Sequence, residues 1–485
     1  MLQLNKECLQ ALSGNLPVPK YSRDSLDPKI LHIGVGGFHR SHMAAYTDEL
    51  LNDNKSDWSI HGVGMTENDT KIAEVLYSQD CLYTLITCSN DSIRARVVGS
   101  ITKFTLCCQD TDDFCEQIAK ADYRIISLTV TENGYYYTGA ERNLNWNHPD
   151  ILHDIGNPQK PKTPIGFLFR VAQLRINAEL PLPTFLSCDN LPQNGNVLRK
   201  LLLQFANEAD QETALIIADK GKFPNSMVDR ITPKTRVETK KYLSKRWGLN
   251  DAWPVFSESF RQWYLEDEFS LGRPDWEKVG VKFVKDVAPF ELMKIRLLNG
   301  THSAMAYMSD LLGYQKVSDA VNDININQFI KNYMAEVTPT LGLVPGVNLE
   351  KYQMKIVQRF SNPAIADQIE RLCEDGSGKI PNAILNPMAE LLQSEKPLNY
   401  TTVAVASWIY WLHVSSDTKE IKDPNAAMLL DAAKLCKTDI SPFLALEDFI
   451  PAKLRKNLKF FHLVNAAYSN FLRYSVNHTL TSILK

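Results

Sequence analysis

The first half of the chain alternates short apolar runs with segments of helical periodicity. Residues 30–35 form an apolar run that ends in glycines, 38–51 have helical spacing, and 58–65 are again strand-like. This order predicts a βαβ unit. Three further apolar runs are predicted as strands: 124–130, 184–188 and 214–218. A helix is expected at 197–208, between the last two of these runs. Such alternation is typical of an α/β domain with a mostly parallel sheet covered by helices.

The pattern changes near residue 285. Strand signals become scarce, and long stretches carry helical periodicity: 317–337, 349–360, 364–373, 402–413 and 452–474. A chain of 485 residues also exceeds the size at which one core usually stops growing. We therefore predict an α/β domain over residues 1–285 and a mainly α-helical C-terminal domain over 286–485.

Composition and charge favour small-molecule partners. The 53 basic and 56 acidic residues are spread along the chain and give a formal net charge of -3, without the cationic stripe of a nucleic-acid-binding protein. The first residues lack the pattern of a secretory signal, and the longest apolar stretch, 403–414, is shorter than the ~20 residues that span a bilayer. We expect a cytoplasmic protein without membrane or nucleic-acid partners, as a monomer or small homo-oligomer.

Cysteine and histidine spacings do not indicate a metal site. The nine cysteines are scattered without a Cys-x-x-Cys pair, which favours free thiols over disulfides or a zinc cage. His39 and His42 stand three residues apart, but no nearby carboxylate or cysteine completes a ligand set. No metal is expected.

The segment 291–302 combines residue types that perform proton chemistry. On a continuous helix, Glu291, Lys294, Asn299 and His302 would share a wedge of roughly 140° with aliphatic neighbours. Burial among aliphatic side chains lowers the pKa of a lysine, so Lys294 is a candidate proton acceptor. Asn299 and His302 are then candidates for holding the oxygen that loses its proton. The alternative is an amphipathic helix whose Lys294 reaches water and which ends at Asn299 and Gly300.

A glycine-rich turn follows the first predicted strand and opens a helix. Glycines in this context let a backbone approach a pyrophosphate at a helix N-terminus, which predicts a Rossmann-type dinucleotide site, although a plain turn is the alternative. His39 stands where the third glycine of G-x-G-x-x-G is expected, so helix and strand are predicted to pack less closely there. The candidate cofactor-binding residues are Gly34, Val35, Gly36, Gly37, Phe38 and His39.

Acidic and amide residues follow three of the predicted strands. Glu67 and Asp69 stand where an acidic group would bind an adenosine ribose and repel a 2′-phosphate, which favours NAD over NADP, unless they belong to a charged surface loop. Glu132 follows the strand 124–130 and is expected to face the cofactor. Asn190 is a candidate donor to a developing alkoxide, whereas Asp189 and Asn190 would alternatively cap the next helix.

Five colinear segments of the chain resemble the polyol-specific long-chain dehydrogenases. They are Ile-Gly-Val-Gly-Gly-Phe-His-Arg at 33–40, Ser-Leu-Thr-Val-Thr-Glu at 127–132, Cys-Asp-Asn-Leu-Pro at 188–192, Pro-Asn-Ser-Met-Val-Asp-Arg-Ile-Thr-Pro at 224–233 and Lys-x4-Asn-x2-His at 294–302. The likeness runs from about residue 20 into the C-terminal third. It implies a Rossmann-type domain followed by a largely helical one, and nicotinamide chemistry without zinc.

The resemblance also implies roles for individual residues. Lys294 matches the general base, Asn190 and Asn299 the residues that bind the reacting oxygen, and His302 the residue that orients substrate. Further matches are Glu291 on a proton exit path, Asp229 in a supporting position, and Arg371 and Lys379 in the sugar pocket.

We expect from this resemblance an NAD-dependent polyol dehydrogenase, most like the mannitol-oxidising members of the family. It would oxidise D-mannitol, or a similar secondary polyol, reversibly to D-fructose. Two alternatives stay open: a fructuronate or tagaturonate reductase, for whose carboxylate Arg371 and Lys379 are candidate partners, and a nicotinamide-binding regulator without turnover.

Overall fold

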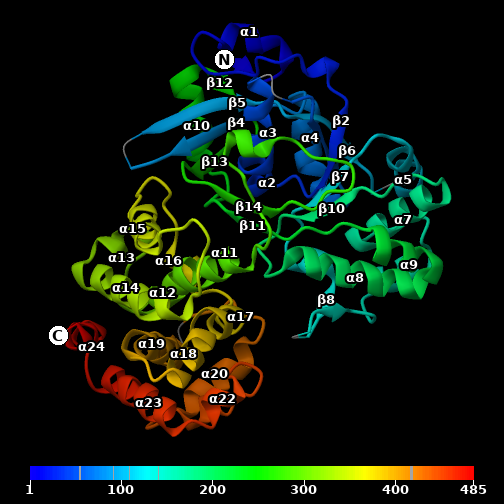
Figure 1. Ribbon diagram of the computed structural model, residues 1–485. Helices are drawn as coiled ribbons and strands as arrows, with labels where there is room; N and C mark the ends of the chain where they lie inside the picture. Colours follow the sequence, from blue (N-terminus) through cyan, green and yellow to red (C-terminus); the bar gives the residue numbers. More distant parts are fainter. Residues whose placement is uncertain (54–55, 91, 109, 140, 416–418, 485) are drawn as a thin grey trace. The chain divides into compact units, whose positions relative to one another are not determined.

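The chain folds into two compact units in the computed structural model, which describes residues 1–53, 56–90, 92–108, 110–139, 141–415 and 419–484. The first unit spans Met1–Ala288 and the second spans Pro289–Lys485. Figure 1 shows strands and helices in the first unit, coloured blue to green, and helices in the second, coloured yellow-green to red.

A five-stranded parallel sheet forms the centre of the first unit, with strand order β10-β7-β2-β3-β6. The strands are β2 (Pro28–Ile33), β3 (Ser59–Gly64), β6 (Ile101–Leu106), β7 (Ile125–Leu128) and β10 (Thr184–Ser187). From β2 the chain builds outward through β3 and β6, and then returns to place β7 on the other side of β2. The carboxyl ends of β2 and β7 therefore form the switch point at which open α/β sheets bind ligands.

Both faces of this sheet are buried. Successive strand residues point to opposite faces, so Ile30 and Ile125 belong to one hydrophobic core and Leu31 and Ile126 to the other. The first core includes residues of α3 (Met43–Asn52) and α4 (Thr70–Ser78), and Phe38 of α2 (Gly37–Ser41) packs against it. The second includes residues of α5 (Thr111–Lys120), α6 (Pro149–Gly156), α7 (Pro164–Asn177), α8 (Asn194–Ala209) and α9 (Gln211–Lys220). The side-by-side packing of α7, α8 and α9 is visible in Figure 1.

Smaller sheets extend the first unit. Two of them have three strands: β11 (Ser226–Asp229), β14 (Gln262–Glu266) and β15 (Lys282–Val284) in one, and β13 (Val255–Glu258), β4 (Tyr83–Cys88) and β5 (Ile93–Val98) in the other. The two-stranded pairs are β1 (Leu2–Gln3) with β12 (Leu249–Asn250) and β8 (Tyr137–Thr138) with β9 (Asn143–Leu144). The remaining α-helices of the unit are α1 (Leu9–Leu12) and α10 (Val237–Trp247).

One predicted strand of the first unit is wrong, because residues 214–218 lie inside helix α9. The Asp210 side chain caps this helix by accepting from the backbone N–H groups of Glu212 and Thr213. Ala214 and Ile217 are buried, whereas Leu215 is 70% exposed. A run of five apolar residues is too short for periodicity to distinguish a strand from a helix of which one face is buried. The predicted helix 38–51 is likewise divided, with α2 ending and α3 beginning at His42.

The second unit consists of helices joined by loops, and its described residues form no named strand. The α-helices are α11 (Ala288–Met293), which begins at the last residue of the first unit, α12 (Gly300–Leu311), α13 (Val317–Asn322), α14 (Ile324–Val337), α15 (Leu349–Phe360), α16 (Ile369–Cys373), α17 (Gly376–Ile380), α18 (Asn386–Gln393), α19 (Asn399–Ser415), α20 (Ala426–Leu435), α21 (Ser441–Leu444), α22 (Ala452–Arg455), α23 (Leu458–Arg473) and α24 (Val476–Ile483). Two π-helices, Lys294–Asn299 and Pro381–Leu385, interrupt this series.

Helix α12 lies at the centre of this unit and packs against α14, α16 and α19. The predicted fold class, a mostly parallel α/β domain followed by a mainly helical one, is confirmed. Within the described ranges, no helix combines the length and the apolar character that crossing a membrane requires.

His61 on β3 gives the first unit an expected sensitivity to acid. Its ring lies between the hydroxyls of Tyr123 (2.6 Å from Nδ1) and Thr105 (2.8 Å from Nε2), and burial lowers the pKa of His61 to about 3. Below the ordinary pKa of about 6.5, the unfolded chain binds a proton that the folded chain does not, so the free energy of unfolding falls as pH falls toward 3.

The His61→Gln variant lacks this titrating group. We therefore expect its free energy of unfolding to fall less steeply as pH falls, by about 1.4 kcal/mol per pH unit, the contribution of one proton. Urea denaturation of both proteins at pH 7, 6 and 5 measures the two slopes. Parallel slopes would contradict a neutral buried imidazole at this position.

Candidate active site

The turn after β2 needs glycine at its first position. Gly34 has a φ of +89°, and a Cβ there would lie 2.3 Å from the Thr129 carbonyl oxygen of the neighbouring strand. Gly36 differs, because the nearest atom to its Cβ position is the Gly34 carbonyl oxygen at 3.9 Å. Gly37 is similarly open, with Thr232 Cγ2 at 3.7 Å. Gly34 is therefore required by the turn itself, while Gly36 and Gly37 leave room for an external group.

Helix α2 begins directly behind this open space. Gly36 is its N-cap, and no side chain caps its first N–H groups. Uncapped N–H groups at a helix start are available to an anion. Val35 is buried in the core and Phe38 is half-buried, so Val35 offers a ligand its backbone alone.

The His39 ring is buried within the first unit. It is 1% exposed and stacks on His32 with 3.4 Å between the ring centroids. Among the described residues neither of its nitrogens has a hydrogen-bond partner, and burial holds the pKa of His39 well below its usual value. The ring is therefore buried, and the prediction that His39 binds the cofactor rests on its backbone. Its imidazole, stacked on His32, fills the space between helix α2 and strand β2. A glycine at position 39, as in G-x-G-x-x-G, would let the helix and strand pack more closely.

His32 braces the glycine turn, a role that the pattern of apolar residues did not reveal. Its Nδ1 lies 2.8 Å from Ser127 Oγ and its Nε2 lies 2.9 Å from Thr129 Oγ1. The Thr129 hydroxyl in turn donates to the Gly34 carbonyl oxygen at 2.7 Å. These bonds tie β2 to β7 at the switch point. The available signal was a histidine within the apolar run 30–35.

Glu67 and Asp69 occupy different environments after β3. Asp69 Oδ2 accepts from the backbone N–H groups of Met65 (3.0 Å) and Thr66 (2.9 Å) and from the Thr66 hydroxyl. Its carboxylate is therefore committed to the turn before α4. Glu67 is exposed, and its side chain is the better placed of the two for a ribose.

The loop after β7 is held by Asp189. Its carboxylate accepts from Val130 N (3.0 Å), Thr131 N (2.8 Å) and the Tyr135 hydroxyl (2.8 Å), and burial raises its pKa. Thr131 has a φ of +62°, unusual for a β-branched residue. Glu132, which follows, is exposed. The N-cap of α8 is Gln193, so the alternative that Asp189 caps the next helix is wrong, and Asn190 beside it lies at the surface of this unit.

Asn194 is a second residue that the sequence analysis missed. Its Nδ2 donates to the carbonyl oxygens of Asp189 (3.0 Å) and Ser226 (2.8 Å), and its Oδ1 accepts from Ser226 N (2.9 Å). A Cβ on Gly195 would lie 2.6 Å from the Pro224 carbonyl oxygen, so Gly195 allows this close approach. The loop after β10 is thereby joined to β11, at whose end Asp229 is 5% exposed.

In the second unit, the segment 291–302 is helical throughout but is not a regular α-helix. Helix α11 ends at Met293, the π-helix spans Lys294–Asn299, and α12 begins at Gly300. The wider π-turns rotate each residue by less than the 100° of an α-helix, which shifts Asn299 and His302 relative to the wedge expected from the sequence. Such turns are frequent at functional sites.

Gly300 does not end this helix. A Cβ there would lie 2.4 Å from the Tyr333 hydroxyl and 3.1 Å from the Ala383 carbonyl oxygen. Gly300 therefore allows α12 to approach α14 and the second π-helix. Lys294 and Glu291 are each 8% exposed and Asn299 is half-buried, so the alternative in which Lys294 reaches water and the helix stops at Gly300 is wrong.

Arg296 anchors the first π-helix to α18. Its Nη1 donates to Glu390 Oε2 at 2.8 Å and also to the Thr340 carbonyl oxygen, while Nη2 donates to the other Glu390 oxygen. Two parallel bonds between a guanidinium and a carboxylate restrict orientation as well as distance. These bonds hold the backbone of the π-helix in place, and with it the residues on either side of Arg296.

His302 lies among charged residues of the second unit. Its ring stacks on Phe360 with 3.8 Å between centroids, and its Nε2 is buried without a partner among the described residues. Burial lowers the pKa of His302 to about 3, partly offset by Asp367 and reinforced by Arg371 and Lys379. The structure therefore gathers His302, Arg371 and Lys379, which are far apart in the sequence.

The two cations beside His302 are held differently. Arg371 donates to both Asp367 oxygens at 2.8 Å and 2.6 Å, whereas Lys379 Nζ donates to the Glu374 carbonyl oxygen at 2.7 Å. Burial and the nearby Arg371 hold the pKa of Lys379 below its usual value, with Asp375 acting in the opposite direction. The charge of Arg371 is thus offset by a carboxylate, while that of Lys379 is not offset by a direct ion pair among the described residues.

The described residues contain no group of three or more His, Cys, Asp or Glu side chains placed to hold a metal ion. All nine cysteines are free, and eight of them are buried.

Two family models cover most of the chain. The mannitol dehydrogenase Rossmann domain matches residues 28–278, and the mannitol dehydrogenase C-terminal domain matches residues 286–472. The chain belongs to the mannitol dehydrogenase family. It is therefore an oxidoreductase, and the Rossmann-type prediction for the first unit is confirmed.

Relatives of known sequence and structure agree with this family. The chain is 42% identical to a mannitol dehydrogenase of Saccharomyces cerevisiae, over 94% of this chain and 92% of the relative. Among solved structures, it is similar to Pseudomonas fluorescens mannitol 2-dehydrogenase in a ternary complex with NAD and D-mannitol (39% identity, TM-score 0.88, 100% of this chain and 99% of the other). It is also similar to a D-sorbitol dehydrogenase in substrate-free form (33% identity, TM-score 0.90, 98% and 100% covered).

Proposed function

We propose that this chain is an NAD-dependent polyol dehydrogenase that oxidises D-mannitol reversibly to D-fructose with Lys294 as general base. The observation that carries the proposal is the burial of Lys294 at the start of a braced π-helix, five residues before Asn299 and eight before His302. The solved relative that holds NAD and D-mannitol, 39% identical over the whole chain, supports the choice of substrate and cofactor.

The first unit offers residues that fit a dinucleotide. The open backbone at Gly36 and Gly37 and the uncapped start of α2 suit a pyrophosphate. The exposed carboxylate of Glu67 suits the adenosine ribose and would repel a 2′-phosphate, which favours NAD over NADP. Glu132 is the candidate contact near the nicotinamide end. When bound, NAD supplies the acceptor for the substrate hydride.

The protein's own part of the reaction is proton transfer and stabilisation of charge. Neutral Lys294 takes the proton of the substrate hydroxyl, since burial disfavours the charged form of an amine. Asn190 and Asn299 donate to the oxygen as it becomes negative, where loss of one donor typically raises the barrier by ~2.7–4 kcal/mol. Glu291, one helical turn before Lys294, passes the proton outward.

Binding of the remaining hydroxyls falls to residues of both units. His302, neutral and stacked on Phe360, orients the substrate, and Arg371 and Lys379 donate to its hydroxyl groups. Asp229 at the end of β11 is an acceptor for a hydroxyl. A domain organisation follows from these assignments, in which the first unit binds the cofactor and the second supplies the base and most of the substrate contacts.

A fructuronate or tagaturonate reductase is the second candidate, because Arg371 and Lys379 would also suit a carboxylate. The bidentate pair between Arg371 and Asp367 argues for the polyol. A guanidinium already paired with a carboxylate attracts a second anion less strongly, while its remaining donors still bind neutral hydroxyls.

The function is tested by following NADH consumption with fructose, fructuronate and tagaturonate in parallel. We expect turnover with fructose, little or none with either uronate, and a lower kcat/KM when NADPH replaces NADH. Preferred turnover of a uronate would overturn the substrate assignment. Tight NADH binding without turnover of any of the three would instead indicate a nicotinamide-binding regulator.

A further inference from the structure

A pocket in the first unit is lined by residues other than those proposed for catalysis and cofactor binding. It has a volume of about 540 Å³, within the range of small-molecule sites. Its walls include Glu49 from α3, Arg94 and Arg96 from β5, Arg230 after β11, and Arg261 just before β14. We call it the arginine pocket.

The lining of the arginine pocket is cationic. Among the described residues, four arginines and one glutamate line it, a formal charge of +3. Two further carboxylates lie behind the wall: Asp48, 0% exposed and paired with Arg96, and Glu258, 3% exposed and close to Arg230. When Asp48 and Glu258 are included, the formal charge of the group falls to +1, although neither residue is part of the pocket lining.

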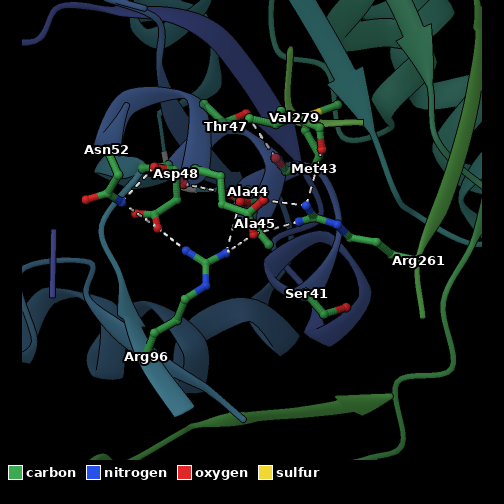
Figure 2. Close-up of polar contacts among 12 residues, drawn as sticks. Ser41, Met43, Ala44, Ala45, Thr47, Asp48, Asn52, Arg96, Arg261 and Val279 are labelled. Atoms are coloured by element: carbon green, nitrogen blue, oxygen red, sulfur yellow. Dashed lines mark hydrogen bonds and ion pairs between the residues drawn. The ribbon is translucent and has the colours of Figure 1, made fainter. Parts of the chain in front are cut away.

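Two of the four guanidinium groups share the carboxylate of Glu49. Arg96 donates to Glu49 at 3.0 Å as well as to Asp48 and the Ala45 carbonyl oxygen. Arg261 donates to both Glu49 oxygens and to the Val279 carbonyl oxygen, with its guanidinium 3.9 Å from the centre of the Tyr46 ring. Figure 2 shows both guanidinium groups pointing toward helix α3. Each uses three of its five N–H donors in these bonds.

Among the described residues, the guanidinium of Arg230 donates to backbone carbonyl oxygens and to no carboxylate. Arg230 is 7% exposed, and its guanidinium donates to the backbone carbonyl oxygens of Glu258 (3.0 and 2.9 Å) and Ser41. Burial, together with repulsion from Arg261 and Arg96, lowers the pKa of Arg230 to about 10. The group remains charged at neutral pH, and the mutual repulsion is a cost that a bound anion would relieve.

We propose that the arginine pocket binds a small polyanion carrying phosphate or carboxylate groups. A planar guanidinium with free N–H donors matches both kinds of oxyanion in geometry and charge. The hydroxyls of Thr87 and Ser259 in the wall add neutral donors. A neutral polyol would find donors here but would not offset the charge. The inference does not depend on the proposed reaction.

Isothermal titration of the full chain tests this site, with pyrophosphate as the phosphate probe and citrate as the carboxylate probe, each in the presence and absence of NADH. We expect saturable binding of at least one probe with one site per chain, unaffected by NADH and weakened about tenfold by Arg94→Gln. Arg94 is exposed and is not part of the bonds that hold α3, so this variant is expected to fold. Binding of pyrophosphate alone, or of citrate alone, identifies the class of ligand.

Arg124→Gln is the matched control, because Arg124 is a partly exposed arginine paired with Asp122 elsewhere in the unit. Arg261→Gln is the second variant and is expected to weaken binding as well. Absence of saturable binding, unchanged affinity in Arg94→Gln, equal weakening by Arg124→Gln, or displacement by NADH would each overturn the proposal.

Discussion

Replacement of Lys294 by alanine is expected to lower kcat for polyol oxidation by about 10²–10⁴-fold, the usual contribution of a positioned general base. The affinity for NADH should stay near that of the unaltered protein, because the glycine turn belongs to the first unit and Lys294 to the second. Steady-state kinetics with mannitol and a fluorescence titration with NADH measure the two effects separately.

Lys294→Met is the matched control for packing, because it keeps a long side chain in the buried position while removing the amine. We expect it to be as inactive as the alanine variant and more stable. If Lys294→Met retained turnover, or if both variants lost NADH affinity in proportion to activity, the lysine would have a structural role instead.

Two glycine variants should separate cofactor binding from folding. Gly36 has a φ of -90°, which any residue tolerates, and its Cβ would meet no atom closer than 3.9 Å. Gly36→Ala is therefore expected to leave the free energy of unfolding unchanged and to weaken NADH binding by roughly tenfold or more, about 1.4 kcal/mol, because the methyl group occupies the space proposed for the pyrophosphate. Urea denaturation and NADH titration are the measurements.

Gly34→Ala should instead destabilise the first unit, by about 1–3 kcal/mol or more, since it combines a positive φ with a Cβ only 2.3 Å from the Thr129 carbonyl oxygen. Its NADH affinity is expected to fall as a consequence of the distorted turn. Unaltered NADH binding in Gly36→Ala would show that the cofactor does not approach this backbone.

Several features could be predicted because they depend on residues close in sequence. The strands β2, β3, β7 and β10 were recognisable because apolar runs bounded by glycine, proline or polar residues report burial on both faces of a parallel sheet. The requirement for glycine after β2 was likewise local. Helix α9 shows the limit, because five apolar residues satisfy a strand and a one-sided helix equally well.

Side-chain partners could not be predicted in the same way. Asp69 and Arg371 bind partners within four residues in the chain, but the sequence alone does not show that these local bonds form in place of a contact with a ligand. The burial of His39 depends on His32 across the β2–α2 turn, and the π-helix at Lys294 is braced by Glu390 from another helix. A regular helix was expected because sequence periodicity assumes a constant rotation per residue.

The arginine pocket shows the same division most clearly. By itself, the sequence determined the division into an α/β part and a helical part, the glycine turn and the order of the family motifs. Each of these depends on residues that are close together in the chain. Only the tertiary structure decided which charges meet: Arg94, Arg230 and Arg261 come from segments separated by more than one strand and helix. Electrostatic interactions depend on distance in space, which the chain sets only when β5, β11, β14 and α3 have packed together.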